Sequence, residues 1–147
     1  MAGKNQTIMV TGSAGFIGFH LSKKLLDNGE NVIGVDNLNK YYDVTLKKSR
    51  LDILKSHRNF VFYKEEIQNF EALDKIFKQH GVDLICNLAA QAGVRYSLKD
   101  PFSYQKSNLE GFLNLLELAR KYEIKNFVYA SSSSVYGEAI ALPFEET

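Results

Sequence analysis

The chain has 147 residues, of which 45% are hydrophobic and 24% charged, values that are ordinary for one globular domain. Its formal net charge of +1 offers no basic surface for nucleic acid or an acidic membrane, so we expect neither partner. The single cysteine, Cys86, excludes an internal disulfide, and no apolar run reaches the roughly 18 residues of a membrane span. These features predict a cytoplasmic protein.

Short apolar runs alternate with helical patterns along the chain. Strands are expected at 7–11, 32–35, 60–63, 82–88 and 127–130, and helices at 16–28, 44–56, 70–79 and 102–122. The first helix is expected to bury Ile17, Leu21, Leu25 and Leu26. Apolar strands separated by helices are typical of a parallel sheet that is covered on both faces. The sequence therefore predicts an α/β fold with three α/β/α layers around a doubly wound parallel sheet of the Rossmann type.

A glycine-rich segment, Val10-Thr-Gly-Ser-Ala-Gly-Phe-Ile-Gly18, joins the first strand to the first helix. A turn from strand to helix whose amides approach a pyrophosphate needs residues without a Cβ atom. Asp36 ends the next apolar run, where a carboxylate can bind the adenosine ribose and repel a 2′-phosphate. The pattern favours NAD over NADP. Two alternatives stay open: the glycine-rich segment could be a turn that binds no ligand, and Asp36 could be only a turn residue.

Three further segments follow strands at the same expected edge of the sheet. Glu66 and Ile67 could lie beside an adenine, or Glu66 could be a solvated acid in a charged run. The small residues of 87–91 could admit a cofactor or simply pack tightly. Serines 131–134 could bind a reacting hydroxyl or form a solvated loop, and Arg95 could bind an anion or be an exposed loop residue. The three histidines have no metal-site spacing, so no metal is expected.

The helical pattern at 102–122 carries more large apolar residues than one buried face needs. Leu109, Phe112, Leu113 and Leu116 form one stripe, and further leucines lie on an adjoining face. Such a helix is either buried on all sides or paired with a second copy of itself. We expect a homodimer.

Four segments together resemble the NAD-dependent epimerase/dehydratase family of the extended short-chain dehydrogenases/reductases: VTGSAGFIGFHL, GVDNLNKYYDVTLKKSRL, NLAAQAGVRYS and YASSSSVYG. The resemblance extends from about residue 7 to 145. The glycine loop is shared across that superfamily. The segments 36–43 and 89–97 are more particular, and are most similar to the family's UDP-glucuronate 4-epimerases.

The resemblance implies roles for individual residues. Those that would contact NAD are Gly12, Gly15, Phe16, Ile17, Gly18, Asp36, Asn37, Glu66, Ile67, Leu88, Ala89, Ala90, Gln91 and Asn108. Those that would face the UDP-sugar substrate are Arg95, Ser97 and Ser133. Ser132 matches the family's catalytic hydroxyl. Because serines stand on both sides of it, a shift of one residue would place a neighbouring serine at the matching position instead. Many relatives carry aspartate where this chain has Glu66.

The reaction that the resemblance implies moves a hydride from sugar C4 to NAD and returns it to the other face, converting UDP-glucuronate to UDP-galacturonate through a 4-keto intermediate. In this superfamily the base is a tyrosine beside a lysine. None of the eight tyrosines is followed four residues later by lysine. We therefore expect residues 1–147 to be the N-terminal NAD-binding domain of such an enzyme, inactive alone. Another epimerase or dehydratase of the family, or a non-catalytic NAD-binding module, stays open.

Overall fold

In the computed structural model, which describes residues 5–138 and 143–145, five parallel strands form one sheet in the order β3-β2-β1-β4-β5. The strands are β1 Thr7–Thr11, β2 Asn31–Val35, β3 Phe60–Tyr63, β4 Leu84–Asn87 and β5 Asn126–Tyr129. The central strand β1 pairs with both β2 and β4. The strand order therefore reverses beside β1, and the two neighbouring loops diverge there, as they do in nucleotide-binding folds of this class. The predicted doubly wound parallel sheet is confirmed.

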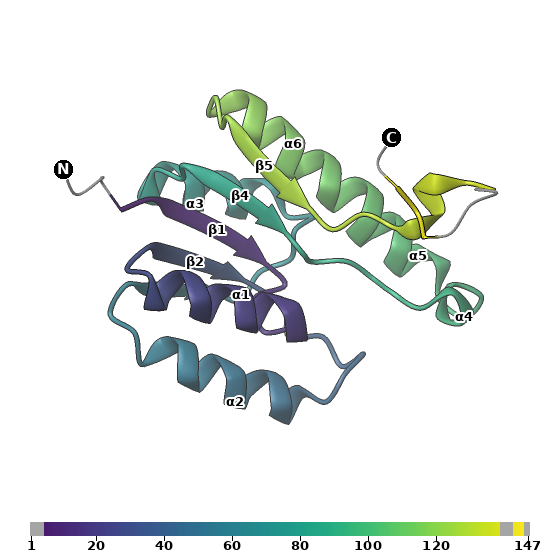
Figure 1. Ribbon diagram of the computed structural model, residues 1–147, viewed down its shortest axis with the longest axis horizontal. Coiled ribbons are helices and arrows are strands. Elements are labelled where there is room, and N and C mark those ends of the chain that lie inside the picture. The colour runs from purple at the N-terminus through teal and green to yellow at the C-terminus, as the bar shows by residue number, and fades with distance from the viewer. Residues whose placement is uncertain (1–4, 139–142, 146–147) are drawn as a thin grey trace.

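Helices cover both faces of the sheet (Figure 1). One face carries α1 (Phe16–Asp27) and α2 (Val44–Lys55), and the other carries α3 (Phe70–His80) and α6 (Phe112–Lys121). Along β1, Ile8 and Val10 pack with the first pair of helices, whereas Met9 packs with the second. Side chains that alternate between two buried faces require strands that are apolar at every position. The three predicted layers are confirmed.

The buried face of α1 differs from the predicted one. Ile17 is 63% exposed, and Leu21 and Leu25 are only partly buried. Leu26 is buried as expected, and the other buried residues of α1 include Phe19, which the predicted stripe left out. Ile17 lies in the first turn, at the carboxyl edge of the sheet, before the helix runs back over the strands. The predicted stripe was therefore wrong at Ile17, because helical periodicity alone does not say where a helix first meets its sheet.

The predicted helix at 102–122 is helical but not α-helical throughout. It begins with α5 (Pro101–Tyr104), continues as a π-helix, η1 (Gln105–Gly111), and ends with α6. A Cβ atom at Gly111 would overlap the Ile67 side chain, so this wider turn packs closely on the segment after β3. Single π-helical turns often occur where a helix serves a functional site. Two short elements, α4 (Val94–Ser97) and a 3₁₀-helix, η2 (Ser133–Tyr136), follow β4 and β5.

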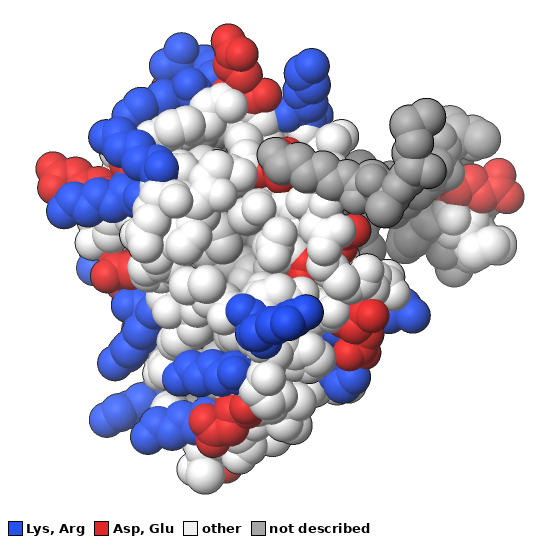
Figure 2. Space-filling model, turned by 90° about the vertical axis from the view of Figure 1, so that its left-hand side faces the viewer, with Lys and Arg blue, Asp and Glu red and all other residues white. Residues whose placement is uncertain are grey.

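The surface is mixed in charge. Basic and acidic side chains are interspersed around the margin of the side where the strands begin, and uncharged side chains occupy its middle (Figure 2). This distribution agrees with the small net charge. Among the residues that the structure describes, no helix has both the length and the apolar character needed to cross a bilayer.

A charged cluster joins α3 to the end of α6. The carboxylate of Asp74 accepts hydrogen bonds from Lys121 Nζ and Tyr122 Oη, each at 2.6 Å, and pairs with Lys78 Nζ at 2.7 Å. The hydrogen bonds from Lys121, Lys78 and Tyr122 hold the pKa of Asp74 well below its usual range. The hydrogen bond to Asp74 raises the pKa of Tyr122 to about 12.

We expect Asp74→Asn to lower stability at neutral pH and to flatten its dependence on acid. Because the folded carboxyl has a pKa below the unfolded value of about 3.9, its contribution is complete above that value and is lost as the pH falls further. Urea unfolding at pH 7 and pH 3 measures this difference. The control is Asp52→Asn, on the exposed side of α2. The prediction would be contradicted if the free energy of unfolding fell by the same amount from pH 7 to pH 3 in the wild type and in Asp74→Asn.

Candidate functional site

The loop between β1 and α1 is closed tightly against its surroundings. Gly12 has a φ of +68°, and a Cβ atom there would lie 3.0 Å from backbone atoms of Leu88 and Ala89. A Cβ atom at Gly18 would overlap the carbonyl oxygen of Gly12. Both neighbours are backbone and cannot move aside as a flexible side chain could. The first turn of α1 and the segment after β4 therefore approach the loop closely only because glycine occupies these positions.

The first turn of α1 is uncapped and accessible. Gly15 is the N-cap residue, and no side chain forms a capping hydrogen bond there. Phe16 and Ile17, the first helical residues, are 67% and 63% exposed. The first amides of a helix have no partner within the helix, and the helix dipole adds partial positive charge at this end. Such a terminus can bind a phosphate group.

Thr11, buried at the end of β1, ties this strand to β4. Its hydroxyl donates to Asn87 Oδ1 at 2.5 Å and accepts from the backbone N–H groups of Leu88 and Ala89, both at 3.1 Å. The bonds fix the segment after β4 beside the glycine loop. Thr11 could not be identified from the sequence, because threonine is common in strands whether or not its hydroxyl has a special partner.

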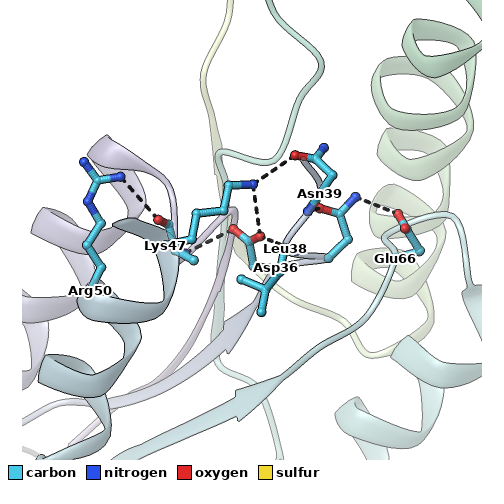
Figure 3. Close-up of polar contacts among 8 residues, drawn as sticks. Asp36, Leu38, Asn39, Lys47, Arg50 and Glu66 are labelled. Carbon is cyan, nitrogen blue, oxygen red and sulfur yellow. Dashed lines mark hydrogen bonds and ion pairs between the residues drawn. The ribbon is translucent and has the colours of Figure 1, made fainter. Parts of the chain in front are cut away.

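Asp36 is buried at the end of β2, and three groups hold its carboxylate. Oδ2 accepts from the Ala14 amide at 3.1 Å, and Oδ1 accepts from the Leu38 amide at 2.8 Å. Lys47 Nζ, on α2, lies 3.7 Å from Oδ1 (Figure 3). The predicted ribose carboxylate thus connects the glycine loop, the loop after β2 and helix α2. Hydrogen bonds use two of the four directions in which a carboxylate accepts, so others are left for a ligand.

The loop after β2 also contacts the segment after β3. Asn37 Nδ2 donates to Glu66 Oε2 at 2.9 Å, so the structure brings these two predicted cofactor residues together (Figure 3). Ile67 is buried in the core and packs against Gly111. Its contact with an adenine stays a prediction.

Asn108 fixes the loop after β4 from the π-helix. Its Oδ1 accepts from the Gln91 amide at 2.8 Å, and its Nδ2 donates to the Gln91 carbonyl at 2.9 Å. Both ends of the side-chain amide therefore bind the backbone of one residue. In this arrangement Asn108 acts on the site by holding the strand-end segment that includes Ala89 and Ala90.

A cavity of about 680 Å³ lies between the loops after β2, β3 and β4. The predicted residues that line it are Asn37, Glu66 and Gln91. Tyr41 lies at its edge, where its hydroxyl donates to the Ala92 carbonyl at 2.9 Å and its ring meets the Tyr96 ring edge-on. This tyrosine connects the loop after β2 to the loop after β4. The volume is in the range of small-molecule and cofactor sites.

The residues predicted to face a sugar lie farther along the edge. Arg95 and Ser97 belong to α4, and Arg95 lines a second, open cavity of about 400 Å³ beside Tyr41 and Tyr96. Ser132 and Ser133 lie at the start of η2, and both are exposed. Ser132 Oγ accepts from the Ser134 amide at 3.2 Å. Their roles toward a substrate stay predictions.

Comparison with known proteins agrees with this geometry. Residues 9–147 match the family model described as GDP-mannose 4,6 dehydratase. The chain belongs to the NAD-dependent epimerase/dehydratase family. The match covers nearly all of the chain, including the glycine loop, Asp36 and the segment after β4. The resemblance inferred from the sequence is confirmed.

Individual relatives include several 4-epimerases. A UDP-glucuronate 4-epimerase of Thermodesulfobacterium geofontis is 50% identical over 138 residues, which cover 94% of this chain and 42% of that enzyme. One solved structure is a mutant UDP-glucuronic acid 4-epimerase from Bacillus cereus in complex with UDP-4-deoxy-4-fluoro-glucuronic acid and NAD. It is 35% identical with a TM-score of 0.84, and the match covers 96% of this chain and 45% of that one. A UDP-glucose 4-epimerase of Thermotoga maritima with UDP-glucose is 38% identical with a TM-score of 0.78, covering 93% and 41%. The chain therefore spans less than half the length of these relatives.

We expect Thr11→Val to lower the free energy of unfolding by about 2–4 kcal/mol, because it leaves the buried Asn87 side chain and two half-buried amides without their partner. Urea denaturation measures the loss. The control is Thr7→Val at the other end of β1, where we expect a change within about 0.5 kcal/mol. Equal losses at the two positions would show that the Thr11 hydroxyl has no special role.

Proposed function

We propose that this chain is the NAD-binding part of a nucleotide-sugar 4-epimerase that converts UDP-glucuronate to UDP-galacturonate. The observation that carries the proposal is that the glycine loop, the uncapped first turn of α1 and the Asp36 carboxylate lie together at the carboxyl edge of the sheet. Each of these features matches one part of a dinucleotide.

The residues present fit NAD. The pyrophosphate would bind at the backbone of 12–18, where close contacts with neighbouring backbone exclude side chains at Gly12 and Gly18. The adenosine ribose would bind Asp36, and the adenine would enter the cavity beside Asn37 and Glu66. Bound NAD would supply the acceptor for a hydride from the sugar. The carboxylate of Asp36 disfavours a 2′-phosphate at the same place.

The choice of UDP-glucuronate is supported by the relatives and by the segment around α4. Arg95 can bind an anionic group of the sugar nucleotide through its planar guanidinium, and Ser97 and Ser133 would also face the substrate. Ser132 would orient the reacting hydroxyl. A different nucleotide-sugar epimerase or dehydratase is the second candidate, which the dehydratase description of the family model favours. The lack of a Tyr-x-x-x-Lys motif in the 147 residues favours a non-catalytic NAD-binding module as the third.

We expect the chain to bind NAD and Gly18→Ala to bind it at least about tenfold more weakly, because a Cβ atom at this position overlaps the Gly12 carbonyl. Isothermal titration calorimetry measures both affinities. Asp74→Asn, on α3, is the control for a general loss of stability. The NAD-loaded chain should produce no sustained UDP-galacturonate from UDP-glucuronate. Sustained turnover would refute the expectation that it lacks its base, and undiminished NAD binding by Gly18→Ala would refute the proposed site.

We also propose that the exposed side of η1 and α6 mediates self-association. Leu109, Leu113 and Leu116 are 67%, 58% and 40% exposed, and their spacing places them on one side of a helix. Leu113→Lys should therefore shift the chain toward monomer in sedimentation-velocity experiments. Leu46→Lys, at an exposed leucine of α2, is the control. A wild-type chain that stays monomeric at high concentration would rule the interface out.

A further inference from the structure

Lys47 is a buried cation beside the proposed ribose carboxylate. Its Nζ donates to Asn39 Oδ1 at 2.9 Å and lies 3.7 Å from Asp36 Oδ1, and both side chains of the ion pair are less than a tenth exposed (Figure 3). Lysine is rarely buried unless its charge is paired, because removing an ammonium group from water is strongly unfavourable. The position of Lys47 therefore depends on Asp36 and Asn39.

A second cation of α2 reaches the same edge. Arg50 Nη1 donates to the Ala14 carbonyl at 3.4 Å, and its guanidinium carbon lies 5.7 Å from the centre of the Phe16 ring. Helix α2 thus directs two positive side chains toward the glycine loop (Figure 3). Asp36 is the acid that offsets the charge of Lys47.

We infer that Lys47 positions Asp36 and Asn39 for the adenosine ribose and determines which cofactor the site accepts. The inference rests on the proposed NAD binding. While Asp36 is present, the pair has no net charge, Asn39 is held in place, and the carboxylate accepts a ribose hydroxyl while repelling a 2′-phosphate. When substitution removes the charge of the carboxylate, Lys47 becomes an unpaired cation beside the proposed ribose site and attracts a 2′-phosphate. Arg50, on the same helix, adds a second positive charge at this edge.

This role differs in its consequences from simple structural support. A lysine that only stabilised the fold would affect NAD and NADP binding alike. A lysine that supplies the pocket's positive charge makes the effect of Asp36→Asn depend on residue 47, because the two charges act on the same ribose substituent.

The experiment measures Kd for NAD and for NADP by calorimetry in the wild-type chain and in five variants: Lys47→Met, Lys47→Arg, Asp36→Asn, the double variant Asp36→Asn with Lys47→Met, and Lys48→Met. Lys48 is the matched control, because it is the exposed neighbour of Lys47 on the same helix. Circular dichroism confirms that each variant is folded.

We expect Lys47→Met to weaken NAD binding about tenfold, Lys47→Arg to stay within about threefold of wild type, and Lys48→Met to have no effect. Asp36→Asn should raise the preference for NADP over NAD by about tenfold or more, and the double variant should lose this gain. If Lys47→Met does not fold, Asp36→Asn and Lys47→Arg still decide, because the first must favour NADP and the second must keep NAD.

Three results would overturn the inference alone: unchanged NAD affinity in Lys47→Met, no shift toward NADP in Asp36→Asn, or an equal shift with and without Lys47. A wild-type chain that binds neither cofactor would overturn the proposed function, and the inference would fall with it.

Discussion

The close approach of the first turn of α1 to the Gly12 carbonyl is the constraint on which the carboxyl edge of the sheet depends. Since no side chain fits at Gly18 or Gly12, the helix can begin directly beside the end of β1, and the backbone after β4 can lie against the same loop. Thr11 then fixes that backbone by two hydrogen bonds, and a third joins its hydroxyl to the Asn87 side chain. The result is an edge of closely packed backbone at which the first turn of α1 has no side-chain cap.

The loops that follow β2, β3 and β4 are held by polar contacts between segments that are distant in the sequence. Asp36 binds the glycine loop and pairs with α2, Asn37 binds Glu66 after β3, and Tyr41 binds the Ala92 carbonyl after β4. Asn108 holds Gln91 from the opposite layer. A pocket whose walls are fixed in this way loses less conformational freedom when a ligand binds, which favours affinity.

The strands and the glycine loop could be predicted from the sequence because their signals are local: apolar runs, glycine spacing and an acid at a strand end. Thr11 and Lys47 could not, since their partners lie across the sheet or on another element. In the sequence Lys47 is one of several lysines in a basic helical stretch, and nothing in its spacing distinguishes it from Lys48. The π-helix was not predicted either, since the close packing of its Gly111 on Ile67 joins two segments that are distant in the sequence.

Along the carboxyl edge of the sheet, the residues proposed to bind the adenosine and those proposed to bind the sugar differ in burial and in hydrogen bonding. At the adenosine end, Asp36 and Lys47 are buried and have several partners each. At the end proposed for the sugar, Ser132 and Ser133 are exposed, and Ser132 bonds only to its own turn among the described residues. Strand β5 beside them is also largely exposed. Buried polar groups with fixed partners hold one geometry, whereas exposed hydroxyls adopt many. The preorganised part of this molecule is therefore the part proposed to bind the cofactor, and its contribution to an epimerase would be holding NAD rather than moving the proton.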